Sequence, residues 1–339
     1  MSEEGTESSE AGALGIGVLG AAGQLGRCLV RGIDRAEDLE LAFAATRDQI
    51  DLGDFDSIGE WLDSREAPLP EVVINAAAYT KVDACESKKE LAYRMNAMAP
   101  AEWARHLMER NVHFIHVSTD YVFAGDGSRP YREEDETAPK TVYGSSKRAG
   151  EVAVLGTDPN ALVVRTSWVF GPGRNFVVAI LDQAARRRTG ELEGPLRVVD
   201  DQSGAPTYAA DLAEALLAVS RRGHPSGDPL HGLLHLRNAG ETTWFGFARA
   251  ILDHGGYRDL EIEPVATSAF KTAAARPAYS VLSSERAEAL GITMRPWREA
   301  LIDYLSSPDA PRELLGKDSG RGAESGTRGS LVAQHPGSS

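Results

Sequence analysis

The sequence predicts an α/β fold, in which a doubly wound parallel sheet is followed by a smaller C-terminal lobe. Three observations support this prediction. Apolar runs that suit strands alternate with runs that suit helices between residues 16 and 166. A glycine-rich turn separates the first strand from the first helix. After about residue 170 the alternation weakens, which indicates a second region of different construction.

The first half of the chain alternates strands and helices in a regular order. Strands are expected at residues 16–19, 39–45, 72–75, 112–118 and 161–166. Helices are expected between them, at 24–33, 55–64, 85–110 and 143–155. Asp54 is a candidate cap for the second helix, and a break in the third is expected near Pro100. Strands joined by helices form parallel units, and these units build an open sheet.

The second half gives fewer and shorter elements. Helices are expected at residues 175–188, 209–220 and 243–252. Short strands are expected at 196–199, 233–236 and 262–264. Some of these segments are expected to rejoin the main sheet, so the lobe does not separate cleanly from it.

Composition and charge narrow the class of protein. The chain has 339 residues, with 36 Lys and Arg against 50 Asp and Glu, a net charge of −14. An acidic chain argues against nucleic acid as a general partner. Cys28 and Cys85 form neither a disulfide framework nor a metal-binding pattern. No apolar run is long enough to span a bilayer, and the first residues lack the order of a signal peptide. We therefore expect a cytoplasmic protein.

The glycine-rich turn has the sequence GAAGQLG at residues 20–26. Glycines after a first strand allow a tight turn and let a pyrophosphate approach the helix N-terminus. The alternative is a strand–helix turn without a ligand, but its position favours cofactor binding by Gly20, Gly23, Gln24, Leu25 and Gly26. We assign residues 14–170 to a Rossmann-type NAD(P)-binding domain. Residues 171–307 form a mainly substrate-binding lobe, and 1–13 and 308–339 are disordered tails.

The second strand ends without the acidic residue that would bind a ribose 2′-hydroxyl. Arg47 stands near that position and could face a 2′-phosphate, which favours NADPH over NADH. The alternative is a solvated surface arginine. Asp51 and Leu52, a few residues further on, are candidates to flank the adenine.

The third strand ends in three alanines, which leave space for a planar group against the backbone. Tight helix–sheet packing would also explain them, but the carboxyl end of a strand favours a ligand. Asn96 lies inside the following helix, where asparagine is intrinsically poor. It is expected either to hold a water or carbonyl near the site or to lie on the surface. The cofactor-binding residues predicted here are Ala76, Ala77, Ala78, Tyr79 and Thr80.

Tyr143 and Lys147 lie four residues apart, which places both side chains on one face of a helix. A nearby ammonium favours the phenolate, so we expect Lys147 to lower the pKa of Tyr143 and make it a usable acid or base. Thr119 ends the preceding strand, where its hydroxyl could donate to a substrate carbonyl. The alternative for Thr119 is a turn or cap hydroxyl. With the glycine turn, these residues indicate hydride transfer with a nicotinamide cofactor.

Four further segments add to these residues: VSTDYVF at 117–123, TSWVFG at 166–171, DQSGAPT at 201–207 and ARP at 275–277. Together they resemble the extended short-chain dehydrogenase/reductase family over residues 15–305. Within that family they resemble the dTDP-4-dehydrorhamnose reductase branch.

The resemblance implies a reaction and roles for individual residues. NADPH, or alternatively NADH, would deliver hydride to C4 of dTDP-4-dehydro-L-rhamnose, giving dTDP-L-rhamnose. Tyr143 would protonate the C4 oxygen, Lys147 would hold the nicotinamide ribose, and Thr119 would bond the substrate oxygen. A homodimer is an open expectation. The substrate-binding residues implied are Thr119, Asp120, Trp168, Val82, Asn175, Gln202 and Arg276.

Several alternatives can be weighed from the residues. Asp120 is followed by Tyr121, whereas dehydratases of the wider family have a glutamate there, so dehydration lacks a catalytic group. A ketoreductase or epimerase for another deoxysugar nucleotide remains open, as does a non-catalytic regulatory subunit. Some members of the branch bind magnesium through a glutamate where this chain has Cys28. Because a thiol is a poor ligand for magnesium, we predict no metal site.

Overall fold

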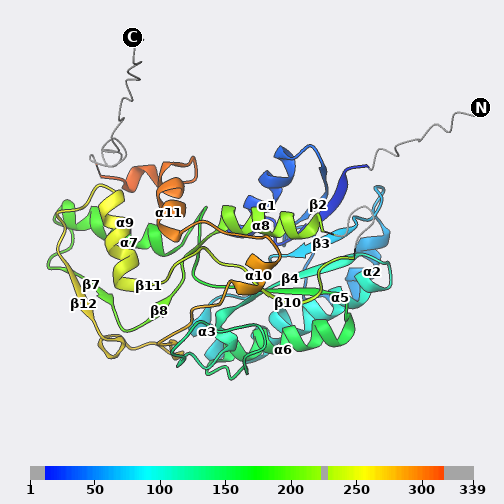
Figure 1. The fold of residues 1–339 in the computed structure, drawn as a ribbon, viewed down its shortest axis with the longest axis horizontal. Helices are drawn as coiled ribbons and strands as arrows, with labels where there is room; N and C mark the ends of the chain where they lie inside the picture. Colours follow the sequence, from blue (N-terminus) through cyan, green and yellow to red (C-terminus); the bar gives the residue numbers. More distant parts are fainter. Residues whose placement is uncertain (1–11, 223–227, 317–339) are drawn as a thin grey trace, which may run out of the picture.

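The computed structural model describes residues 12–222 and 228–316. Its centre is a six-stranded sheet with the order β2-β1-β3-β4-β5-β10, in which every neighbouring pair is parallel (Figure 1). The predicted doubly wound parallel sheet is therefore confirmed, and the predicted strand near residue 233 does rejoin it. The strands are β1 (Leu14–Leu19), β2 (Leu39–Ala45), β3 (Val72–Asn75), β4 (His113–Thr119), β5 (Leu162–Thr166) and β10 (Gly232–His235).

Helices cover both faces of the sheet (Figure 1). On one face, α1 (Gln24–Arg35) packs against α8 (Ala209–Ser220) over a core of aliphatic side chains. On the other, α2 (Phe55–Asp63), α5 (Ala99–Met108) and α6 (Val142–Thr157) enclose a second core with Trp103 and Phe114. Covering on both faces explains why β1 and β3 read as continuous apolar runs rather than as alternating ones.

The helical stretch expected at residues 85–110 differs from the prediction. It begins earlier, as α3 (Val82–Ser87) and α4 (Lys89–Tyr93), and continues through a π-helical turn, η1 (Arg94–Met98), into α5. The expected break near Pro100 is wrong. Pro100 lies in the first turn of α5, where a missing N–H is tolerated. The irregularity instead lies at η1, which contains the buried Asn96.

The C-terminal lobe forms around aromatic side chains of α7 (Phe176–Arg188), α9 (Trp244–His254) and α11 (Trp297–Ser306). These helices lie together at one side of the molecule in Figure 1. The lobe's small ladders pair β7 (Leu196–Val199) with β12 (Ile262–Val265), β6 (Val169–Phe170) with β9 (Thr207–Tyr208), and β8 (Ser203–Gly204) with β11 (Thr242–Thr243). Its shorter helical segments are η3 (Thr267–Ala269) and η4 (Arg312–Leu314), whereas α10 (Glu285–Ala289) packs beside β10 of the main sheet.

Two smaller predictions need correction. Asp54 precedes α2, but its side chain makes no capping hydrogen bond. The tail predicted from residue 308 starts too early, because Asp309 pairs with Arg31 at 2.5 Å and Leu314 and Leu315 pack against the lobe core. Residues 1–11 and 317–339 of the predicted tails lie outside the described residues.

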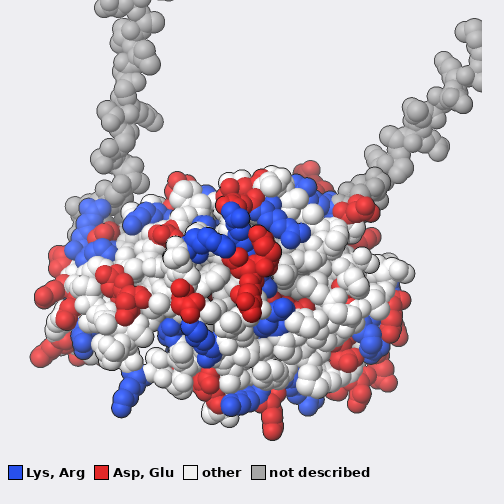
Figure 2. Space-filling view, turned by 60° about the horizontal axis from the view of Figure 1, so that its bottom comes forward, with Lys and Arg blue, Asp and Glu red and all other residues white. Residues whose placement is uncertain are grey.

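The surface charge and the length of the helices test the expectations about nucleic acid and membrane partners. Figure 2 shows basic and acidic side chains intermixed on one face of the molecule, without a broad basic area there. No helix within residues 12–222 and 228–316 combines the length and apolarity needed to cross a membrane.

Candidate active site

A cavity of about 860 Å³ opens where the strands β1, β3, β4 and β5 end, between the sheet and the lobe. This is the edge at which doubly wound sheets bind ligands. Most of the site residues predicted from the sequence line the wall of this cavity. The predicted residues outside the wall are Gly26, Tyr79, Asn175, Gln202 and Arg276. Those in the wall are Gly20, Gly23, Gln24, Leu25, Arg47, Asp51, Leu52, Ala76, Ala77, Ala78, Thr80, Val82, Thr119, Asp120, Tyr143, Lys147 and Trp168.

The glycine turn shapes one end of this cavity. Gly20 has a φ of 78° and faces Ala77, whose nitrogen would lie 2.8 Å from a Cβ at Gly20. Helix α1 begins after Gly23 without a side-chain cap, so its first amides remain available to an anion. Gln24 lines the cavity, and its Oε1 is buried without a hydrogen-bond partner. The close approach at Gly20 and the free amides of α1 fit a cofactor pyrophosphate, whereas Gln24 Oε1 can only accept a hydrogen bond.

The turn after β3 is fixed from both ends. Asn75 Oδ1 accepts a hydrogen bond from the Ala77 amide at 2.9 Å. Asn96 Oδ1 accepts from the Tyr79 amide at 2.7 Å, and Asn96 Nδ2 donates to the Tyr79 carbonyl at 3.1 Å and to Ser146 Oγ at 3.0 Å. The prediction that Asn96 holds a carbonyl near the site is confirmed, and the surface alternative is wrong. Gly26 and Tyr79 thus shape the wall without lining it.

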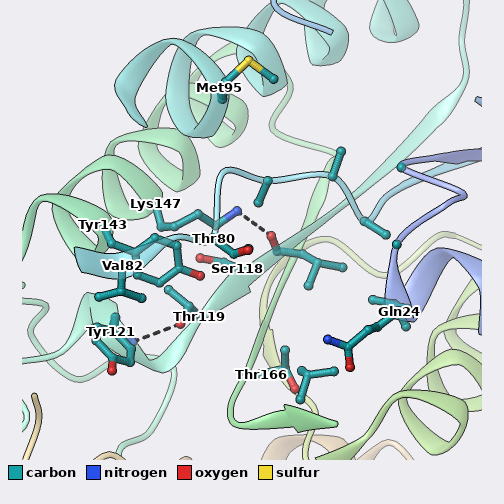
Figure 3. A pocket seen from close by; sticks show the side chains of 18 of the residues that line it. Gln24, Thr80, Val82, Met95, Ser118, Thr119, Tyr121, Tyr143, Lys147 and Thr166 are labelled. Atoms are coloured by element: carbon teal, nitrogen blue, oxygen red, sulfur yellow. Dashed lines mark hydrogen bonds between the residues drawn. The ribbon is translucent and has the colours of Figure 1, made fainter. Parts of the chain in front are cut away.

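Tyr143 and Lys147 lie one turn apart on α6, and both line the cavity (Figure 3). Thr141 begins the helix, since its Oγ1 accepts a hydrogen bond from the Gly144 amide at 3.0 Å. Lys147 Nζ donates to the Val117 carbonyl at 2.7 Å and lies 3.1 Å from His116 Nε2. The lysine is therefore anchored to β4, on the same strand that ends in Thr119.

The predicted effect of Lys147 on Tyr143 is wrong for this structure. Burial raises the pKa of Tyr143; the neighbouring Thr119 opposes this, while Asp120 and Tyr121 add to it. Burial lowers the pKa of Lys147 to about 8, against the opposing charge of Glu151. Desolvation outweighs the nearby charge because both groups are enclosed. The phenol of Tyr143 consequently keeps its proton at neutral pH, as a proton donor requires.

Thr119 and Asp120 lie where β4 passes into η2 (Asp120–Val122). Thr119 Oγ1 donates to Asp120 Oδ1 at 2.9 Å and accepts from the Tyr121 amide at 3.3 Å. Burial raises the pKa of Asp120 to about 6, although Ser280 and Thr119 act against it. Thr119 thus lines the cavity and is also the turn hydroxyl given as its alternative, whereas its contact with a substrate carbonyl stays a prediction.

A buried ion pair supports the site from behind. Arg165 on β5 donates to both carboxylate oxygens of Glu151 on α6, each at 2.8 Å. Ser118 Oγ donates to the same carboxylate at 2.7 Å, and all three side chains are buried. Bidentate pairing of this kind fixes geometry as well as charge. The ends of β4 and β5 are thereby held against the helix that presents Tyr143 and Lys147.

Trp168 forms the lobe side of the cavity. Its backbone is left-handed, with a φ of 46°, which is uncommon for a large side chain. Gly204 lies against the indole, and a Cβ there would collide with the ring. Gln202 stands behind this wall, where its Oε1 accepts a hydrogen bond from Trp244 Nε1 at 3.1 Å.

Two predicted substrate residues have structural partners outside the cavity wall. Asn175 begins α7, because its Oδ1 accepts from the Val177 amide at 2.9 Å. Arg276 Nη2 pairs with Asp83 Oδ2 at 2.6 Å. Their contact with substrate, like that of Gln202, stays a prediction.

Sequence reasoning missed several residues of the wall. Thr166 ends β5 as Thr119 ends β4, and Ser167 follows it, so the rule applied to β4 would have found both. The Thr166 hydroxyl is buried without a hydrogen-bond partner. Met95, Phe176 and Trp244 have no local motif that marks them.

Sheet order, glycine turn and the set of Thr119, Tyr143 and Lys147 define the class of this protein, an extended short-chain dehydrogenase/reductase. The chain belongs to the RmlD substrate binding domain family, whose model matches residues 15–309.

Named relatives agree with this assignment. The dTDP-4-dehydrorhamnose reductase of Mycobacterium tuberculosis is 46% identical over 246 residues, which are 70% of this chain and 77% of that protein. A probable dTDP-4,6-dihydroxy-2-methyloxan-3-one 4-ketoreductase of Streptomyces antibioticus is 40% identical, covering 87% of this chain and 97% of that protein. A solved dTDP-4-dehydrorhamnose reductase from Bacillus anthracis, in complex with NADP, has a TM-score of 0.76 at 32% identity. That match covers 87% of this chain and 99% of the other.

Proposed function

We propose that this protein reduces the C4 ketone of dTDP-4-dehydro-L-rhamnose with NADPH and releases dTDP-L-rhamnose. The observation that supports this best is the Tyr143 phenol, which keeps its proton and lines the same cavity as the glycine turn. The identity of the substrate is inferred from the names of the reductases among the relatives. A cytoplasmic location rests on the composition of the sequence, and a homodimer rests on the resemblance alone.

The cavity residues suit a dinucleotide with a 2′-phosphate. The uncapped start of α1 would take the pyrophosphate, and Gln24 Oε1, an unpartnered acceptor, would take a hydrogen bond from a cofactor hydroxyl rather than from the phosphates. Arg47 lines the cavity just after β2, which ends without the acidic residue that would bind a ribose 2′-hydroxyl, although Asp51 lines the same cavity. Ala76, Ala77 and Ala78 would border the cofactor with small side chains. When bound, NADPH supplies the hydride for C4.

The protein's own part in the reaction is to position the ketone and give it a proton. Tyr143 would donate its phenolic proton to the C4 oxygen, so that the C=O group gains hydrogen at carbon and at oxygen. Thr119 would hold that oxygen as negative charge develops on it, once its hydroxyl turns away from Asp120 Oδ1, the acceptor that it has in this structure. The lobe wall at Trp168 would place the sugar. Tyr143 is left as a phenolate, which takes its proton back from solvent before the next turnover.

A second candidate is reduction of a different 4-keto deoxysugar nucleotide. The similarity to the Streptomyces antibioticus protein, named as a probable 4-ketoreductase, favours it. The catalytic residues would be the same, because only the sugar's substituents and stereochemistry differ.

The test is NADPH oxidation by the purified protein. dTDP-4-dehydro-L-rhamnose is made in place from the 4-keto-6-deoxyglucose nucleotide by a 3,5-epimerase, and a parallel reaction omits the epimerase. Oxidation only with the epimerase, with dTDP-rhamnose as product, supports the proposal. Oxidation without it supports the second candidate. Absence of oxidation in both, despite NADPH binding, contradicts the first proposal and favours another sugar nucleotide or a regulatory role.

A further inference from the structure

Three side chains form a buried chain beneath the cavity: Asn75 on β3, His116 on β4 and Lys147 on α6. Asn75 Nδ2 lies 3.1 Å from His116 Nδ1, and His116 Nε2 lies 3.1 Å from Lys147 Nζ. All three side chains are almost completely enclosed. The protonation of His116 and Lys147 is therefore decided by their partners rather than by solvent.

The direction of the hydrogen bonds follows from one fixed amide. Because Asn75 Oδ1 accepts from the Ala77 amide at 2.9 Å, its Nδ2 is the group that faces His116. An amide nitrogen only donates, so His116 Nδ1 must be the acceptor. In a neutral imidazole the proton then stands on Nε2, which points at Lys147.

The proton on His116 Nε2 determines whether Lys147 is an ammonium or a neutral amine. An ammonium has donors and no acceptor, so it cannot pair with an N–H group. A neutral amine can accept from His116 Nε2 while it donates to the Val117 carbonyl at 2.7 Å. The arrangement is consistent only with an uncharged Lys147 beside a neutral His116.

We propose that Asn75 and His116 hold Lys147 as a neutral amine in the cofactor-free protein, and that binding of the anionic dinucleotide protonates it. His116 is a positioning residue that acts through Lys147. The inference rests on the proposed function only in taking NADPH as the ligand. Negative charge brought to the cavity favours the ammonium, which would turn from the His116 Nε2–H group to donate to the cofactor and would then support the phenolate that forms at Tyr143.

The surrounding charges agree with this interpretation. On its own helix Lys147 faces Glu151, whose charge is already paired with Arg165, and Tyr143. From β4 it faces His116, whose pKa burial and Lys147 hold well below the usual value. Burial also lowers the pKa of Lys147 to about 8, so the neutral amine predominates in the cofactor-free protein above that pH, which is why the experiment is done at pH 9.

The experiment is titration calorimetry of NADPH into the protein at pH 9, in two buffers of different ionisation enthalpy. The dependence of the heat on buffer gives the number of protons taken up. We expect most of one proton per NADPH bound. Affinity should also fall by up to roughly tenfold per pH unit above pH 8, as linkage requires. The 2′-phosphate, with a second pKa of about 6, does not titrate there.

Two variants reverse the hydrogen-bond direction. Asn75→Asp keeps an acceptor for the Ala77 amide but presents a second oxygen to His116 Nδ1, which must then hold the proton. Nε2 becomes an acceptor for an ammonium, so the proton uptake should disappear. His116→Gln should act likewise, because its amide oxygen can accept from Lys147. Having both variants guards against one of them failing to fold.

Two further variants serve as controls. His113→Gln makes the same change on the same strand, at a histidine whose neighbour is His231 rather than Lys147, and should retain the uptake. Lys147→Met removes the titrating group and should abolish it.

The outcomes separate this inference from the proposed function. NADPH binding without proton uptake in the unmodified protein overturns the inference and leaves the reductase proposal intact. Uptake that persists in Lys147→Met, or in both folded reversing variants, also overturns it. Failure to bind NADPH at all contradicts the proposed function itself.

Discussion

Trp168 and Trp244 stack face to face, with ring centroids 3.5 Å apart and planes 5° from parallel. Trp168 follows β5, whereas Trp244 begins α9 in the lobe, so the pair joins the two halves of the cavity wall. Trp244 is held in turn by its hydrogen bond to Gln202. The left-handed backbone of Trp168 is thus supported by the residue it stacks on.

We expect Trp244→Ala to weaken sugar-nucleotide binding, because the Trp168 ring loses its support. An aromatic pair contributes about 0.5–1.5 kcal/mol beyond its buried area, so KM for the sugar nucleotide should rise roughly 3- to 10-fold. The Kd for NADPH should stay nearly constant. Trp244→Phe retains a stacking ring and should recover most of the loss. An unchanged KM in Trp244→Ala, or an equal loss of NADPH affinity, would show that the pair does not position the sugar.

The contact between Trp168 and Trp244 is also an example of what could not be predicted from the sequence. The strands, the glycine turn and the Tyr143–Lys147 spacing could be predicted because each is a local pattern with its own periodicity or spacing. The contact of Trp168 with Trp244 is not local, and nothing near residue 244 marks it. The same holds for the chain from Asn75 through His116 to Lys147, whose members come from three separate elements.

The predicted lowering of the Tyr143 pKa by Lys147 was wrong for a related reason. The sequence shows that an ammonium lies one turn from a phenol, but it does not show how far both are enclosed. Burial dominates the pKa of Tyr143, and burial is a property of the packed structure. The prediction of a helix break at Pro100 was wrong because the first turn of a helix accepts proline. The sequence did not reveal that a new helical segment begins at Ala99.

Tyr143→Phe should remove catalysis and leave binding intact. The phenolic proton is lost while the ring is kept, so kcat should fall about 10²- to 10⁴-fold, the usual contribution of a general acid. The NADPH Kd and the thermal midpoint should change little. Turnover and fluorescence-detected NADPH binding measure the two effects. If the protein is instead a regulatory subunit, it has no reductase activity to lose. Its effect on the partner enzyme should then be the same with Tyr143→Phe as with the parent, and that result would favour the regulatory alternative.

Asp120→Asn should stabilise the protein at pH 7.5 and lose this advantage on acidification. Asp120 has its pKa raised to about 6 from 3.8. The folded state therefore binds this proton more tightly than the unfolded state, and stability is lost as pH rises through 6. The shift corresponds to about 3 kcal/mol. Urea unfolding at pH 7.5 and pH 4.5 should show the difference between variant and parent shrinking at the lower pH.

Asp135→Asn is the control of opposite sign for that experiment. Hydrogen bonds from Arg129 and the Arg132 amide lower the pKa of Asp135 to about 2. Its contribution to stability is therefore present at neutral pH and lost on acidification, so this variant should be less stable than the parent at pH 7.5. A fixed difference between Asp120→Asn and the parent at both pH values would contradict a raised pKa at Asp120.

Gly26→Ala should damage the cofactor end of the cavity, whereas Gly156→Ala should not. A Cβ at Gly26 would collide with the Gly20 carbonyl, and the turn would have to move away from the start of α1. Overpacking of this kind costs about 1–3 kcal/mol, and we expect NADPH affinity to fall at least about 10-fold. Gly156 lies in α6, where a Cβ would meet no other atom within 4 Å. Alanine there should raise the free energy of unfolding by about 0.5–1 kcal/mol and leave NADPH binding unchanged. Calorimetric Kd values and urea unfolding of both variants check the pair, and equal NADPH affinities would show that the close approach at Gly26 is not required for the cofactor.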